Sequence, residues 1–240
     1  MNRGVNQVTE PVMAQDVMTD AAFLELCAKG TAEEVRQALN NCGANIEAQD
    51  EQGMTVLMHA AKCNTDLEVM KVLLRAADEF NKKSFLRDKL GFRTVDIDAG
   101  NKDDKTALMF AVKNNSPEVV GTLLNAGADV SIKDKEGMMV LMYAARDSAD
   151  PAVMKVLLDA AAEFNKKGLK SKLGFKTVDV DDGNKEGITA LMFAVGNNSP
   201  ETVQALLNAG AAVNIKDKQD MTALMWAAQR SSPKFKLNSA

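Results

Sequence analysis

Apolar residues in this chain fall into short segments with helical spacing, and the segments come in pairs. In residues 116–127, SPEVVGTLLNAG, apolar side chains recur at intervals of three and four residues, which predicts a helix with one buried face. Its opening Ser-Pro suits an N-cap and a first helical position, and its closing glycine suits a C-terminal stop. The preceding segment, TALMFAVKNN, predicts a shorter helix with Thr106 as its N-cap. Neither helix buries its apolar stripe alone, so each pair must stack against neighbouring pairs.

The helix pair recurs along the chain at a regular spacing. Residues 50–133 and 134–216 are two copies of one unit, because EFNKK, KLGF, TALMFAV, NNSPE and LLNAGA occur in both. The motif that begins at Thr55, TVLMHAA, returns in variant form after steps of 51, 33, 50 and 33 residues. A period of 33 residues with an insertion of 18 or 17 residues in alternate repeats explains these steps. A degenerate copy around Phe23 precedes them, so we expect six repeats, the last of them truncated.

These residues resemble the ankyrin repeat family. The family motif D-x-x-G-x-T-P-L-H-x-A-A corresponds to DEQGMTVLMHAA, DKEGMMVLMYAA and NKEGITALMFAV in this chain, and its later G-A-D-V-N corresponds to GADVS and GAAVN. The motif's proline is Val or Ala here and its histidine is methionine, so the hydrogen bonding of the turns is expected to differ. The resemblance covers about residues 18–230. It implies an all-α ankyrin-repeat solenoid of about six helix-turn-helix repeats, two of them with long basic loop insertions.

The repeat pattern predicts one domain with a poorly packed segment at each end. We expect a flexible N-terminal arm at 1–17, a single ankyrin-repeat domain at 18–230 and a frayed C-terminal tail at 231–240. The expected repeats lie near residues 18–49, 50–100, 101–133, 134–183, 184–216 and 217–230. The last repeat lacks a second helix, so Leu224 and Trp226 are expected to be partly uncovered.

Composition narrows the class of protein. Hydrophobic residues make up 46% and charged residues 26% of the chain, as in an ordinary globular protein. The net charge of −4 argues against nonspecific DNA binding by the whole chain. There is no apolar run of membrane-spanning length and no continuous apolar segment near the start. Three cysteines without CxxC spacing fit a reducing compartment, so we expect a cytoplasmic protein, with secretion or a periplasmic location left open.

Candidate catalytic and metal-binding chemistry is sparse. His59 is the single histidine, which excludes a multi-histidine metal site within one chain. It occupies a position that holds an aromatic ring in the other repeats, which indicates a packing role: Phe110, Tyr143, Phe193 and Trp226. The acidic residues at 96–98 and 179–184 lack the spacing of a calcium loop, and no phosphate-binding glycine motif is present. We therefore expect no enzyme, no cofactor and no metal.

The two insertions are basic, whereas the rest of the chain is acidic. Residues 81–93 carry a net charge of +4 and residues 165–176 carry +5, which leaves about −13 on the remainder. The basic residues are Lys82, Lys83, Arg87, Lys89 and Arg93 in the first insertion, and Lys166, Lys167, Lys170, Lys172 and Lys176 in the second. Both insertions keep Phe and Leu residues, which we expect to pack on the helix ends and hold the lysines outward. The insertions would lie about 20 Å apart, because packed helices lie about 10 Å apart.

The resemblance implies a binding surface made of the turn tips and the exposed face of each first helix. The matching positions are Glu51, Gln52, Met54, Lys62, Lys102, Asp103, Lys105, Lys113, Lys135, Glu136, Met138, Arg146, Lys185, Glu186, Ile188 and Asn197. Met54, Met138, Ile188 and Met221 are apolar residues at turn tips. Their exposure would be unfavourable unless a partner or the neighbouring turn buries them.

We interpret the chain as a noncatalytic protein–protein interaction module that binds a partner through its concave face. The two duplicated basic loops would form a second contact surface, complementary to an acidic surface of another protein. The main alternative is a structural or protective subunit of a larger assembly without a discrete partner peptide. Nucleic-acid binding through the basic loops is less favoured, because the acidic body would repel a polyanion. We expect a monomer.

Overall fold

The computed structural model describes residues 18–88, 94–114, 116–147, 150–170, 178–197 and 199–231. These residues form eleven helices and no β-strand. The helices are α1 Asp20–Lys29, α2 Ala32–Asn41, α3 Val56–Cys63, α4 Leu67–Asp88, α5 Ala107–Lys113, α6 Pro117–Asn125, α7 Val140–Asp147, α8 Pro151–Lys170, α9 Ala190–Gly196, α10 Pro200–Asn208 and α11 Ala223–Ser231. The expected N-terminal arm, residues 1–17, and residues 232–240 of the expected tail lie outside the described part of the chain, whereas Ser231, the first residue of that tail, belongs to α11.

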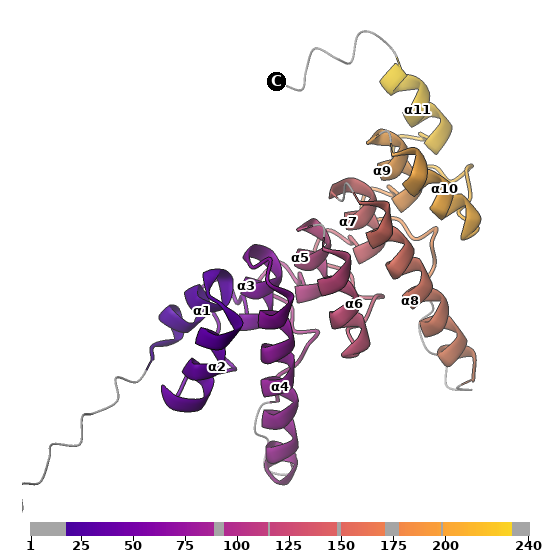
Figure 1. Cartoon of the computed structure of the whole chain (residues 1–240). Helices are drawn as coiled ribbons and strands as arrows, with labels where there is room; N and C mark the ends of the chain where they lie inside the picture. The colour runs from indigo at the N-terminus through magenta and orange to yellow at the C-terminus, as the bar shows by residue number, and fades with distance from the viewer. Residues whose placement is uncertain are drawn as a thin grey trace, which may run out of the picture.

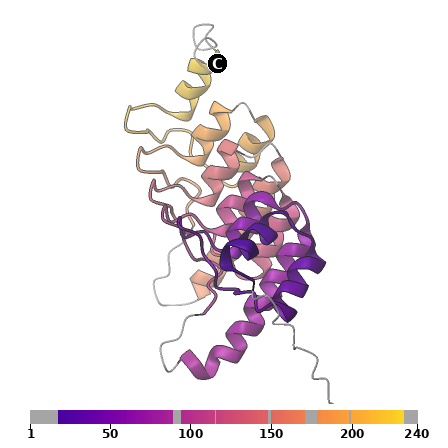
Figure 2. The ribbon, with the colours of Figure 1, turned by 90° about the vertical axis from the view of Figure 1, so that its left-hand side faces the viewer.

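The helices stack in two layers, as the repeat pattern predicts. The first helices α1, α3, α5, α7, α9 and α11 contact one another in that order, and α2, α4, α6, α8 and α10 form the second layer. Figure 1 shows the stack bending so that α4 and α8 diverge, which places the first helices on the inner, concave side. Figure 2 shows the connecting turns gathered along one side of the stack. The predicted all-α solenoid is confirmed.

Local signals in the sequence explain where the helices begin. Ser116 caps α6 by accepting a hydrogen bond from the Val119 amide at 3.3 Å, and Pro117 follows it at the first helical position. Gly127 follows the end of α6 with a φ of 100°, which glycine adopts without strain. Thr106 stands at the N-cap position of α5, but its side chain accepts no hydrogen bond from that helix. Thr106 therefore has the predicted N-cap position but makes no capping hydrogen bond.

A Leu-Met pair in α3, α5, α7 and α9 forms the core of the stack. The leucines at 57, 108, 141 and 191 and the methionines that follow them are at most 3% exposed. The equivalent Leu224 and Met225 of α11 are 72% and 49% exposed, because no further repeat among the described residues covers them. The prediction that the last repeat leaves Leu224 uncovered is correct. Burial of the pair therefore depends on the next repeat, not on the helix that carries it.

Two turn residues, Asp104 and Asp220, have a backbone conformation that their side chains disfavour. Asp104 has a φ of 60° at the turn position that Gly53, Gly137 and Gly187 occupy elsewhere, with φ of 75–78°. We expect Asp104→Gly to raise the free energy of unfolding by about 0.5 kcal/mol, since relief of strain is partly offset by the entropy of glycine in the unfolded chain. Urea unfolding followed by circular dichroism measures this change.

The reverse substitution provides the control. A Cβ atom at Gly137 would lie 3.0 Å from the backbone nitrogen of Lys185, so Gly137→Asp is expected to destabilise the stack by about 1 kcal/mol or more. A loss of stability in Asp104→Gly would contradict the assignment of strain to this turn.

Candidate functional site

The turn tips are joined into one ladder by backbone hydrogen bonds between successive repeats. The amides of Lys102, Lys135, Lys185 and Lys218 donate to the carbonyls of Gln52, Asp103, Glu136 and Glu186, respectively, at 2.9–3.0 Å. Each bond links residues of adjacent turns, so the position of one tip determines the position of the next. The ladder presents the tip side chains at a fixed spacing.

A single Asp or Asn builds each turn from within. The Oδ1 atom of this residue accepts hydrogen bonds at 2.8–3.0 Å from the amides two and four residues later, at Asp50, Asn101, Asp134, Asn184 and Asp217. Burial tends to raise the pKa of Asp50, but hydrogen bonds from two amides and from His59 outweigh it and lower that pKa. The Oδ1 atom of each turn residue, in a carboxylate or an amide, is therefore engaged in holding its own turn together.

The second oxygen of each turn aspartate binds the aromatic ring nine residues later. Asp50 Oδ2 lies 3.0 Å from His59 Nε2, Asp134 Oδ2 accepts from Tyr143 Oη at 2.5 Å, and Asp217 Oδ2 accepts from Trp226 Nε1 at 2.9 Å. Burial and then the bond to Asp134 raise the pKa of Tyr143, which keeps its hydroxyl protonated. Phe110 and Phe193 offer no donor, and their turns carry Asn101 and Asn184 instead of aspartate. This matching of ring and turn residue is visible in the sequence but was not recognised there.

Cationic side chains lie against this aromatic row on the concave face. Lys62 Nζ is 6.0 Å from the ring centroid of Phe110 in the next repeat. Arg146 Cζ is 4.8 Å from the Tyr143 ring and 6.0 Å from the Phe193 ring. These contacts orient positive groups along the first-helix surface and leave Lys62 and Arg146 exposed, although the Arg146 guanidinium also donates to both carboxylate oxygens of Asp147 at 2.8 Å. The face can therefore bind acidic and aromatic groups of another molecule.

Most of the predicted contact residues are exposed on this face. The exposed ones are Glu51, Gln52, Lys62, Lys102, Asp103, Lys113, Lys135, Glu136, Arg146, Lys185, Glu186 and Asn197, and Lys105 and Ile188 are half-buried. The tips thus alternate base and acid, as in the neighbouring pairs Lys135–Glu136 and Lys185–Glu186. Lys105 Nζ lies 3.6 Å from Asp103 Oδ2 within its own turn.

Two apolar residues expected at exposed tips are inside the stack. Met54 is 6% exposed and Met138 is 3% exposed, so neither side chain is available to a partner in this structure. The next turn covers Met138, whose Sδ atom lies 3.5 Å from Asn184 Nδ2. Of the two alternatives for these tips, burial by a partner or by the neighbouring turn, the structure shows the second for Met138.

The two insertions begin as continuations of the second helices. Residues 81–88 belong to α4 and residues 165–170 belong to α8, so α4 has 22 residues and α8 has 20, whereas α6 and α10 have nine each. In Figure 1, α4 and α8 project beyond the other second helices. The description of these segments as loops is therefore wrong for their first part. Of the basic residues, Lys83 and Arg87 lie in α4, Lys167 and Lys170 lie in α8, and Lys89, Arg93, Lys172 and Lys176 lie outside the described residues.

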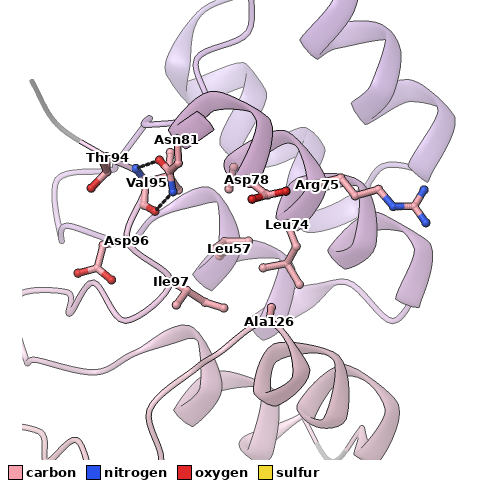
Figure 3. Close-up of a pocket in the computed structure, with 11 residues that line it drawn as sticks. Leu57, Leu74, Arg75, Asp78, Asn81, Thr94, Val95, Asp96, Ile97 and Ala126 are labelled. Carbon is pink, nitrogen blue, oxygen red and sulfur yellow. Dashed lines mark hydrogen bonds between the residues drawn. The ribbon is translucent and has the colours of Figure 1, made fainter. Parts of the chain in front are cut away.

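Two asparagines join the start of each insertion to the chain that follows it. Asn81 donates to the Val95 carbonyl at 2.9 Å and accepts from the Val95 amide at 2.8 Å, and Asn165 pairs with Val178 at 2.9 and 2.7 Å. Figure 3 shows the first clamp beside a cavity of about 620 Å³ between α4 and its returning chain. The exposed Lys82 and Lys166 pair with Asp78 and Glu163, respectively. These asparagine hydrogen bonds hold the returning chain against α4 and α8.

Reactive groups are few in the described part of the chain. No group of three His, Cys, Asp or Glu residues is placed to hold a metal ion there. Burial raises the pKa of the Cys27 thiol to about 12, which makes it a poor nucleophile. Among the described helices, none combines the length and apolar character that a membrane crossing requires.

Comparison with known proteins decides the family. The chain matches the sequence profile of three ankyrin repeats at residues 76–168 and 160–236, and that of a single ankyrin repeat at residues 52–84. The chain belongs to the ankyrin repeat family. Ankyrin repeat domains are noncatalytic modules that bind other proteins.

The relatives of this ankyrin repeat chain are distant. The mouse B-cell lymphoma 3 protein homolog is 32% identical over 145 residues, which are 60% of this chain and 29% of that protein. The chain spans less than a third of the length of the curated relatives it matches. The ankyrin repeat domain of Bcl-3 has a TM-score of 0.63 and 25% identity, with 86% of this chain and 77% of that chain covered.

A second solved ankyrin-like structure contains a protein complex. It is a chain from the complex of the Bdellovibrio bacteriovorus predatory endopeptidase Bd0816 with the immunity protein Bd3460. The TM-score is 0.64 and the identity 28%, and the match covers 88% of this chain and 92% of that chain.

The ankyrin register corrects one predicted contact residue. Asn197 aligns with Asn114, not with Lys62, and the residue of α9 equivalent to Lys62 and Arg146 is Gly196. The side chain of Asn197 donates to the carbonyls of Ala145 and Arg146, as Asn114 does to Ala61 and Lys62. These asparagines link one first helix to the end of the previous one, so Asn197 joins repeats and is not placed to bind a partner.

Proposed function

We propose that this ankyrin repeat chain binds another protein through its concave face, made of the turn tips and the first helices. The two basic extensions of α4 and α8 would form a second contact surface. The single observation that carries the proposal is the row of exposed charges held by the backbone ladder of the turns. A surface already ordered before binding loses little conformational entropy when a partner docks.

The charges of the concave face indicate what kind of partner fits. Lys62, Lys113 and Arg146 are exposed at equivalent positions of α3, α5 and α7. Two of them lie over aromatic rings, so a carboxylate or an aromatic side chain of the partner would meet both a cation and a ring. An extended acidic segment that runs along the stack would contact all three in turn.

The extensions of α4 and α8 would contact the same partner at a second place, away from the concave face. They recur every two repeats and carry the basic residues of the chain's most positive segments. The similar Bdellovibrio structure, in which an endopeptidase and an immunity protein form a complex, supports a protein as the partner class.

Charge reversal on the concave face tests the proposal. A variant with Lys62→Glu, Lys113→Glu and Arg146→Glu is expected to bind the captured partner at least about tenfold more weakly, because three cations would be replaced by repelling charges. The partner is first captured from a lysate of the source organism with the intact chain, and its affinity is then measured by biolayer interferometry.

Two further variants separate the surfaces. Lys155→Glu changes an exposed charge on α8, outside the concave face, and is expected to leave the affinity unchanged. Replacement of residues 84–93 and 168–176 by short glycine turns is expected to weaken binding if the extensions contact the partner. Binding through the concave face would be refuted if the variant with three reversed charges bound the partner as tightly as the intact chain, or if no protein were captured.

A further inference from the structure

A second cavity lies on the outer layer of the stack, away from the concave face. It measures about 500 Å³ and lies between α6 and α8. Its walls are mostly apolar, with contributions from Leu124, Val156 and Phe164, and the carboxylates of Asp159 and Glu163 also line it. The residues that line it include no lysine or arginine.

A glycine inside α6 opens this cavity. Gly121 stands in the middle of the helix, where glycine costs about 1 kcal/mol relative to alanine. A Cβ atom at Gly121 would meet nothing within 4 Å, so close packing does not require the glycine. The equivalent residue of α10 is Gln204, whose Nε2 donates to Asn208 Oδ1 at 2.8 Å. A long side chain fits this helical position, and its absence in α6 leaves space along the cavity wall.

The charge of the cavity also departs from the duplicated pattern. Asp159 of α8 corresponds to Arg75 of α4 in the repeated sequence KVLL-x-AA, so two copied helices carry opposite charges at this place. Glu163 is engaged by Lys166 at 2.6 Å. Asp159 forms no ion pair with any residue that the structure describes. Its charge does reach Lys166, whose pKa is raised first by the hydrogen bond to Glu163 and also by Asp159, so a cation from outside would bind Asp159 beside Lys166. The C-terminal end of α6, which borders the cavity at Asn125, adds partial negative charge.

We propose that the cavity between α6 and α8 docks a protein segment that presents a lysine or arginine beside an apolar side chain. The basic group pairs with Asp159, and the apolar side chain packs against Leu124, Val156 and Phe164. Charge complementarity selects this occupant, because the cavity combines apolar walls with a negative rim. The site lies on the second-helix layer, so a partner on the concave face leaves it accessible. This inference does not depend on the proposed function of the concave face.

Selection from a displayed library of random dodecapeptides tests this inference. The intact chain serves as bait, and peptides that also bind the double variant Gly121→Gln/Asp159→Arg are removed. Enriched peptides are expected to share a Lys or Arg next to Leu, Ile, Phe or Val. In titration calorimetry, Asp159→Arg and Gly121→Gln are each expected to lower the affinity of the best peptide at least about tenfold. The first acts through charge repulsion and the second through loss of space.

Matched controls make the result decisive. Arg75→Asp changes the equivalent position of α4 and is expected to leave peptide affinity within about twofold, as is Lys62→Glu on the concave face. Gly121→Gln raises the helix propensity of α6, so its thermal unfolding shows directly that the variant folds. The proposal is overturned if no peptide distinguishes the intact chain from the double variant, if enriched peptides lack a basic residue, or if Lys62→Glu abolishes their binding.

Discussion

Replacing Leu141 by alanine is expected to lower the free energy of unfolding by about 3 kcal/mol. Leu141 is 1% exposed between α5, α7 and α9, and a buried leucine truncated to alanine loses its transfer free energy and leaves a cavity. The equivalent Leu224 of α11 is 72% exposed, so Leu224→Ala is expected to change stability by no more than about 0.5 kcal/mol. Urea unfolding of both variants, followed by circular dichroism at 222 nm, measures the difference.

This pair of substitutions tests whether the next repeat buries the core. Both leucines occupy the same place in the repeated motif, so helix propensity and local sequence are matched. A loss at Leu224→Ala comparable with that at Leu141→Ala would mean that another part of the chain covers α11. Equal small losses would instead mean that the stack around α7 is loosely packed.

The second large effect concerns the buried pair of Asp134 and Tyr143. Tyr143→Phe and Asp134→Asn are each expected to cost about 2 kcal/mol, because each leaves a buried polar group without its partner. The double variant is expected to be close to the wild type, because Asn101 with Phe110 and Asn184 with Phe193 already occupy these positions in other repeats. The two single losses sum to about 4 kcal/mol and the double variant loses little, so the expected coupling between the two sites is about 4 kcal/mol.

A double-mutant cycle by urea unfolding measures that coupling directly. Asp134→Ala serves as a further variant, since it also removes the acceptor for the amides of Glu136 and Met138 and should cost more than Asp134→Asn. Additive losses in the double variant would show that the matching of ring and turn residue has no energetic basis.

The helices could be predicted from the sequence because their determinants are local. The Ser116 cap, the three- and four-residue spacing of apolar positions and the glycine at 127 each act within one or two helical turns. The uncovered face of α11 was also predictable, because the sequence stops matching the repeat before a second helix. The overall architecture therefore followed from counting repeats.

The details of the candidate surface depend on contacts between distant residues and were harder to predict. Met138 is buried by a turn that begins 46 residues later, at Asn184. Asn81 fixes the returning chain through Val95, 14 residues away. In the sequence alone, Asn81 is only the first residue of a repeated NKK motif. The sequence does not distinguish the continuation of α4 and α8 into the insertions from a loop, because runs of lysine occur both in loops and on exposed helix surfaces. The link between turn aspartates and ring donors could have been found by comparing the five turns with the five rings.

Hydrogen–deuterium exchange of the chain with its captured partner tests binding through the concave face most directly. Binding through the concave face is expected to slow exchange in α3, α5 and α7 and in the turns that carry Lys102, Lys135 and Lys185, with exchange in α2, α6 and α10 unchanged. Protection confined to the second helices, with none in the first helices or the turns, would contradict it.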